Sequence, residues 1–122
     1  MLDHNKCTFV GKVENAPQIS QNVSGKKQAF FHLVVNNKVR DAGGSWVDKF
    51  VKIPIYATEN KAGIIEQYVV KGHELLIEAR YQSWEANGQI QHAFELLGVT
   101  LGYKPRQENA EVKQPQDNNI PF

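Results

Sequence analysis

The 122-residue chain has one cysteine, no long apolar run and almost no net charge. The single Cys7 excludes an internal disulfide framework and a multi-cysteine zinc site. No apolar stretch approaches the roughly 20 residues of a membrane-spanning helix, and the N-terminal "MLDHNKC" lacks the apolar core of a secretory signal. The length suits one domain with its own hydrophobic core. We therefore expect a single-domain cytoplasmic protein with no membrane segment.

An excess of charge of either sign is also missing, since the formal net charge is +1. Residues 1–52 hold eight Lys and Arg against four acidic residues, whereas residues 53–122 hold six against nine. Such a bipolar chain can present a basic groove without a basic overall charge. An ordinary mixed surface would have the same composition, and charge alone favours that simpler interpretation.

Enzyme signatures are missing as well. The four histidines show no metal-binding spacing: His4, His32, His73 and His92. "SGKK" at residues 24–27 resembles a phosphate-binding loop, but Ser20 stands where that motif requires its first glycine. No cofactor or metal is expected. A small hydrolase or nuclease that uses His32 or His73 has no support from a motif.

Five segments have the composition of β-strands: residues 6–20, 29–37, 47–57, 73–84 and 89–103. Gly11 in the first segment predicts a bulge or bend, and Pro17 predicts that this strand passes into a loop. Residues 22–28 and 38–46 have the composition of a turn and a flexible hairpin tip. Asn87-Gly88 predicts a tight hairpin, because both residues accept positive φ.

Residues 58–72, between the third and fourth of these segments, have a helical period and end at the stop signal Gly72. The apolar positions form one stripe: Ala62, Ile64, Ile65, Tyr68 and Val69. The order β-β-β-α-β-β is that of the OB-fold barrel. We therefore predict an all-β fold with one helix, a five-stranded OB-fold barrel over residues 1–103. The polar residues 104–116 predict a disordered linker.

Alternation along a strand assigns each residue to one of two faces. In residues 47–57, one face carries a core set: Val51, Ile53 and Ile55. The other face carries two rings with a lysine between them: Phe50, Lys52, Pro54 and Tyr56. Pro54 has no backbone donor, which predicts a bulge or an edge position there. In the next strand, Arg80, Gln82 and Trp84 share a face.

Rings interleaved with cations suit an unpaired nucleic-acid strand, because bases stack on the rings and Lys or Arg contacts the phosphates. The hairpin at residues 38–46 adds further residues of both kinds: Lys38, Arg40 and Trp46. Each ring alone is more often part of a small core or an oligomer interface. Phe30 and Phe31, for example, are adjacent and cannot both face the core. The combination on one face favours nucleic acid.

Several segments resemble the bacterial single-stranded DNA-binding protein family, including its phage and plasmid members. They are "NKCTFVGKVENAPQI", "QAFFHLVVNN", "FVKIPIYA", "EQYVVKGHELLIEA" and the final "DNNIPF". The resemblance implies an OB-fold that wraps single-stranded DNA without a cofactor, usually as a homotetramer. It also implies that Phe50, Tyr56 and Trp84 stack bases, and that residues 117–122 bind replication, recombination or repair proteins.

The candidate DNA-binding residues are Phe50, Tyr56, Trp84, Trp46, Lys52, Arg80, Lys38, Arg40, Lys12, Lys26, Lys27 and Lys49. The candidate partner-binding residues are Asp117, Ile120, Pro121 and Phe122. The chain departs from the family pattern at three positions. Val39 stands where a tryptophan is common, with Trp46 nearby as a substitute, and Pro54 is unusual within its strand. Asp117 is the single acidic residue of the tip, which predicts weaker docking.

We therefore expect a non-enzymatic, nucleoid-associated protein that binds single-stranded DNA without marked sequence preference. It would protect the DNA during replication, recombination or repair and recruit partners through its tip. A dimeric primosome or recombination accessory protein with the same fold, which acts mainly through protein contacts, remains the alternative.

Overall fold

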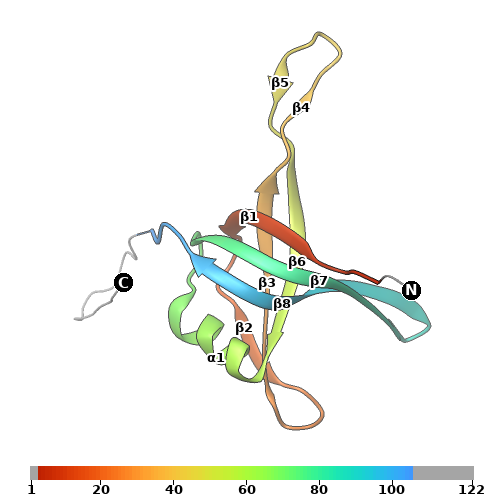
Figure 1. Cartoon of the computed structure of the whole chain (residues 1–122), viewed down its shortest axis with the longest axis vertical. Coiled ribbons are helices and arrows are strands. Elements are labelled where there is room, and N and C mark those ends of the chain that lie inside the picture. Colours follow the sequence, from red (N-terminus) through yellow and green to blue (C-terminus); the bar gives the residue numbers. More distant parts are fainter. Residues whose placement is uncertain (1–2, 106–122) are drawn as a thin grey trace.

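The computed structural model describes residues 3–105, which form a β-barrel with one helix at its side and a projecting hairpin (Figure 1). The elements are β1 (Cys7–Val13), β2 (Gln18–Gln21), β3 (Lys27–Asn36), β4 (Val39–Arg40), β5 (Trp46–Val47), β6 (Phe50–Thr58), α1 (Glu59–Tyr68), β7 (Glu74–Ala86) and β8 (Gln89–Leu101). Most of the predicted linker and the whole predicted tip lie outside the described residues. No helix in the described part is long and apolar enough to cross a membrane.

Five strands close the barrel. They are hydrogen-bonded in the order β1-β7-β8-β6-β3, and β3 pairs back onto β1. Every barrel pair is antiparallel except β6–β8, which is parallel. The helix lies between the third and fourth barrel strands in the chain, so the predicted OB-fold is confirmed. The predicted hairpin is also present, with φ of 53° at Asn87 and 75° at Gly88.

Two short pairings were not predicted. Residues expected to be a loop form β2, which pairs with the outer edge of β3. The turn between them is held by Asn22, whose side-chain oxygen accepts hydrogen bonds from the backbone N–H groups of Ser24 and Lys26. Residues 38–47, expected to contain a hairpin tip, include the separate two-stranded β4–β5 sheet that projects from the barrel (Figure 1).

The core contains apolar residues from all five barrel strands and from α1. Of the predicted stripe, Ala62 and Ile65 in the helix and Val69 just after its end are buried. The predicted stripe was too wide, however, because Ile64 is 43% exposed and Tyr68 is 36% exposed. The helix also ends at Tyr68, before the predicted stop at Gly72, because Val69 adopts an extended backbone with φ −101° and ψ 132°.

The β3–β6 ladder runs without interruption from Gln28↔Thr58 to Asn36↔Phe50. No bulge therefore occurs at Pro54, which pairs with His32. On its other side β6 pairs with β8 only at Ile55 and Tyr56. Pro54 thus lies where the second edge of β6 has no partner strand, which is the edge position that the sequence allowed.

Barrel closure depends on a close backbone approach at Gly11. β1 pairs with β7 from Cys7 to Lys12, and with β3 at Lys12 and Val13, so the strand bends from one partner to the other. A Cβ atom at Gly11 would lie 2.3 Å from the carbonyl oxygen of Val34. Backbone cannot move aside as a flexible side chain can, so this position requires glycine.

Gly11→Ala should lower the free energy of unfolding by about 1–3 kcal/mol or more, the usual cost of overpacking. Gly63→Ala is the control, because a Cβ at Gly63 meets nothing within 4 Å. Alanine should stabilise that helix position by up to about 1 kcal/mol. Thermal melts followed by circular dichroism measure both changes. A Gly11→Ala melt at or above the wild-type temperature would contradict the closure argument.

Candidate nucleic-acid interface

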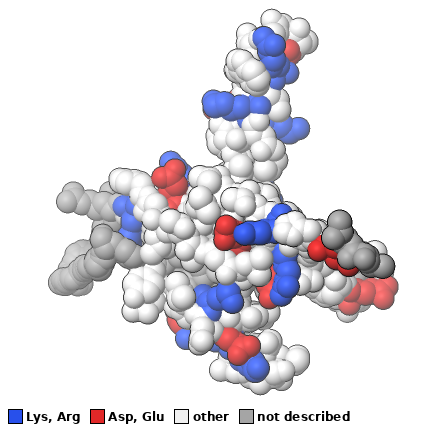
Figure 2. All heavy atoms as spheres, in the orientation of Figure 1, with Lys and Arg blue, Asp and Glu red and all other residues white. Residues whose placement is uncertain are grey.

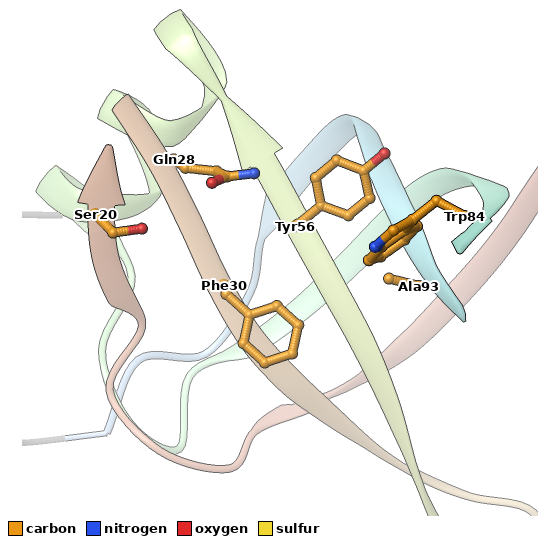
Figure 3. Close-up of a pocket in the computed structure, with 6 residues that line it drawn as sticks. All are labelled: Ser20, Gln28, Phe30, Tyr56, Trp84 and Ala93. Carbon is orange, nitrogen blue, oxygen red and sulfur yellow. The ribbon is translucent and has the colours of Figure 1, made fainter. Parts of the chain in front are cut away.

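Three aromatic rings from three strands meet on the outer face of the barrel. Phe31 is only 3% exposed and faces the core, so its neighbour Phe30 faces outward. The β3–β6 register places Phe30 opposite Tyr56. Trp84 of β7 approaches Tyr56 edge-on, with ring centroids 6.2 Å apart and planes at 76°. The rings line a cavity of about 320 Å³, the ring pocket, together with Ser20, Gln28 and Ala93 (Figure 3).

The ring pocket is open to solvent and has a cation beside it. Trp84 is 47% exposed, so a large part of its surface is accessible to a ligand. Arg80 donates to Glu95 from Nε at 2.9 Å, and Gln82 donates to the same oxygen at 3.0 Å. The hydrogen bond from Arg80 lowers the pKa of Glu95, which keeps this carboxylate ionised. Burial, and then the charge of Glu95, raises the pKa of Tyr56, so its phenol stays neutral.

The same outer face continues along β3 and β6 toward the hairpin. The cross-strand pairs that follow the ring pocket are His32↔Pro54, Val34↔Lys52 and Asn36↔Phe50. The Phe30 and His32 rings meet edge to face at 5.1 Å. Lys52 forms an ion pair with Glu14 at 2.6 Å. Lys12 of β1 lies opposite Val34 on the other side of β3, which brings it to the same row as Lys52.

The β4–β5 hairpin carries rings and cations beyond the end of this face. The Arg40 guanidinium lies 5.3 Å from the centroid of the exposed Trp46 ring, a cation–π contact. Lys38 donates to Asp48 at 2.8 Å. Figure 2 shows basic side chains gathered along the projecting hairpin. Trp46 pairs with Arg40, the residue that follows Val39. Its indole therefore lies close to Val39, the position where the family commonly has a tryptophan.

The structure brings most of the predicted DNA-binding residues onto this connected surface, from Trp84 and Arg80 at one end to the hairpin at the other. The exposed Lys49 lies where the hairpin rejoins β6, with its backbone N–H donated to Asn36 at 3.2 Å. Lys26 and Lys27 are not brought there. They form ion pairs with Glu59 and Glu66 of α1, on a different side of β3.

Four lining residues of the ring pocket were not among the predicted site residues: Phe30, Gln28, Ser20 and Ala93. The signal for Phe30 was present, because only one of two adjacent phenylalanines can face the core. Choosing between Phe30 and Phe31 required the β3–β6 register. Ser20 depends on β2, whose short polar sequence "QISQ" gave no strand signal.

His73 and His32 were the residues considered for a hydrolase. His73 is 1% exposed, and burial lowers its pKa, which favours the neutral ring. His32 lies half-buried on the outer face beside Phe30. His73 is therefore a residue of the barrel interior, and His32 is part of the aromatic surface.

Comparisons with known proteins agree with this geometry. The model of the Single-strand binding protein family matches residues 4–101. Single-stranded DNA-binding protein 1 of Chlorobaculum tepidum is 30% identical over 97 residues, which cover 76% of this chain and 60% of that protein. Its counterpart in Streptococcus pyogenes is 24% identical over 96 residues, which cover 77% of this chain and 72% of that protein. The chain thus spans about three fifths of the Chlorobaculum relative.

Solved structures show the same fold at low identity. A Plasmodium falciparum SSB in complex with ssDNA has a TM-score of 0.68 at 22% identity, covering 84% of this chain and 98% of that one. The small single-stranded DNA-binding protein of Streptomyces coelicolor has a TM-score of 0.65 at 15% identity, covering 84% and 96%. Because the family model matches most of the chain, this protein belongs to the single-strand binding protein family, whose members are non-enzymatic DNA-binding proteins.

Proposed function

We propose that this protein binds single-stranded DNA without marked sequence preference, by stacking bases on exposed rings and contacting phosphates with Lys and Arg. The observation that carries this proposal is the ring pocket, where three aromatic side chains line an open cavity. The charge of Arg80 acts on one of these rings, Tyr56. Unpaired bases offer flat faces for such rings, whereas bases in a duplex already stack on each other. Membership of the family supports the same ligand.

The strand would run from the ring pocket along the outer face of β6 to the hairpin. Tyr56 and Phe50 lie six positions apart on one strand, which is about 20 Å at the rise of a β-strand. Lys52 lies between them, and the projecting hairpin extends the surface further (Figure 1). A surface of this length suits the roughly 4–16 nucleotides that a single OB-fold binds.

The wider role that we propose is protection of single-stranded DNA in the nucleoid during replication, recombination or repair, by a homotetramer. Two exposed apolar residues that pair across β1 and β7, Val10 and Leu76, support a contact between copies. The tip residues Asp117, Ile120, Pro121 and Phe122 would recruit partner proteins.

Native mass spectrometry that finds only dimers would favour the accessory-protein alternative. Partner capture that survives removal of residues 117–122 would refute the tip's role.

Tyr56→Ala and Trp84→Ala should each weaken binding of a labelled dT oligomer by roughly five- to 100-fold, because stacking contributes about 1–3 kcal/mol per base. Fluorescence anisotropy measures the affinity without relying on the tryptophans. Tyr103→Ala is the matched control, since this exposed ring lies beyond the end of β8 and outside the ring pocket. Wild-type affinity should also fall as salt rises. Equal losses in all three variants, or salt-independent binding, would argue against the proposal.

Three of the cations on this surface each form an ion pair with a carboxylate. Glu14 pairs with Lys52, Asp48 with Lys38, and Glu95 with Arg80. Hydrogen bonds from Lys52, Lys38 and Arg80 are the largest causes that lower the pKa of these three carboxyl groups. The carboxylates therefore stay ionised at neutral pH, and DNA phosphates have to replace them. This competition limits affinity and assists release of the strand.

Glu14→Gln should tighten binding of a dT oligomer by roughly twofold to fivefold, since an exposed ion pair is a weak competitor. It should also make the salt dependence steeper, because Lys52 then binds phosphate without a carboxylate partner of its own. Glu66→Gln is the control, as it frees Lys27 on the helix side instead. The affinity of both variants for the dT oligomer is measured over a range of salt concentrations. Unchanged or weaker binding by Glu14→Gln would exclude this competition.

A further inference from the structure

The β4–β5 hairpin has no core that holds it in place. All residues from 36 to 50 are exposed, and the β4–β5 sheet is separate from the six-stranded sheet of the barrel. Figure 1 shows the hairpin projecting beyond β3 and β6. Its direction relative to the barrel therefore has to be set by contacts at its base, where the chain leaves β3 and returns to β6.

The side chain of Asn36 joins the two arms of the hairpin at this base. Its oxygen accepts hydrogen bonds from the backbone N–H of Lys38 at 3.0 Å, on the outgoing arm, and of Lys49 at 3.2 Å, on the returning arm. Its Nδ2 donates to Oδ1 of Asp48 at 2.9 Å. A backbone hydrogen bond from Asn37 to the carbonyl oxygen of Lys49, at 2.7 Å, runs beside these contacts. Asn36 thus clamps both arms.

The clamp holds the chain at a bend. Lys38 has φ of 31°, in the left-handed region that a residue with a long side chain rarely adopts. A single residue in this conformation changes the direction of the strand, and the N–H of this residue is the one bound to Asn36. The hydrogen bond therefore stabilises the conformation that sends the outgoing arm into the hairpin.

Asp48 completes the clamp and also holds a cation of the binding surface. Its Oδ1 accepts hydrogen bonds from Lys38 Nζ at 2.8 Å and from Asn36. Hydrogen bonds from Lys38, and then from Asn36, lower the pKa of Asp48, so it remains an ionised acceptor at neutral pH. A phosphate that takes Lys38 from this carboxylate leaves the hydrogen bond from Asn36 in place. The base of the hairpin can therefore stay fixed while Lys38 contacts DNA.

We propose that Asn36 is a positioning residue for single-stranded DNA: by clamping the base of the hairpin, it holds Arg40 and Trp46 at the end of the path that starts at the ring pocket. The inference rests on the proposed binding of single-stranded DNA. Asn36 lies opposite Phe50, where the outer face of β6 meets the hairpin. A hairpin that is already fixed in direction loses less conformational freedom when DNA binds, so more of its contact energy appears as affinity.

The first test measures the hairpin of the free, full-length protein. Asn36→Ala removes the clamp, and Asn37→Ala is the matched control, because this exposed neighbour has no side-chain hydrogen bond within residues 3–105. NMR relaxation gives backbone order parameters for residues 39–47. We expect them to fall in Asn36→Ala and to keep their wild-type values in Asn37→Ala. Thermal melts of both variants should stay close to that of the wild type, because the clamp lies outside the core.

The second test measures binding of dT oligomers of increasing length by anisotropy. Asn36→Ala should weaken binding of oligomers that reach the hairpin by roughly three- to tenfold, the scale of ordering one flexible side chain. The loss should disappear as the oligomer is shortened to the length that fills the ring pocket alone. Asp48→Asn keeps an oxygen acceptor for Asn36 but frees Lys38, so it should preserve the order of the hairpin and tighten binding of long oligomers.

Wild-type order parameters or wild-type affinity for long oligomers in Asn36→Ala would overturn the inference, and so would an equal loss for short and long oligomers. Loss of hairpin order in Asp48→Asn would also overturn it, since the ion pair of Lys38 with Asp48 would then fix the base. If the wild type binds no dT oligomer of any length, the proposed function itself fails.

Discussion

The antiparallel ladder between β3 and β6 is the constraint on which the binding surface depends. Its unbroken register sends Phe31 and Ile55 into the core and Phe30 and Tyr56 to the outside. A slip of one residue would exchange the two faces, burying the rings that we propose stack bases. Barrel closure holds this register, because β1 can cross from β7 to β3 only where Gly11 meets Val34 without a side chain. A glycine distant from the rings therefore determines how they are presented.

The electrostatics of the surface explain how a chain with a net charge of +1 can bind a polyanion. Cations are concentrated along β6 and the hairpin, but several are held by neighbouring carboxylates rather than left free. In the proposed complex, stacking supplies much of the binding free energy, because phosphate contacts by Lys38, Lys52 and Arg80 each replace an existing ion pair. On such a surface the rings contribute most of the affinity, and the ion pairs reduce what the cations add to it. That balance suits a protein that must both cover a strand and release it.

Much of the architecture could be predicted from the sequence, because three of its signals depend only on residues that are close in the chain. These signals are the alternation of apolar and polar residues in strands, the helical period and the Asn-Gly turn. The outward position of Tyr56 followed from the alternation with Ile55. The role of Phe30 could not be assigned, because it depends on pairing between strands about 25 positions apart. β2 was missed since its few polar residues are held by an Asn22 turn and by the edge of β3. The helix stripe was drawn too wide because Ile64 and Tyr68 satisfy the period yet face an open groove beside Leu97.

The central claim is that single-stranded DNA lies on the outer face of β3 and β6, with its bases against the ring pocket. Titration of the labelled protein with a dT oligomer, followed by NMR, tests this most directly. The account predicts that the largest shifts occur at the side chains of Phe30, Tyr56 and Trp84, and extend to Trp46 on the hairpin. Shifts centred on the groove between α1 and β8, at Ile64, Tyr68 and Leu97, with the ring pocket unchanged, would contradict it.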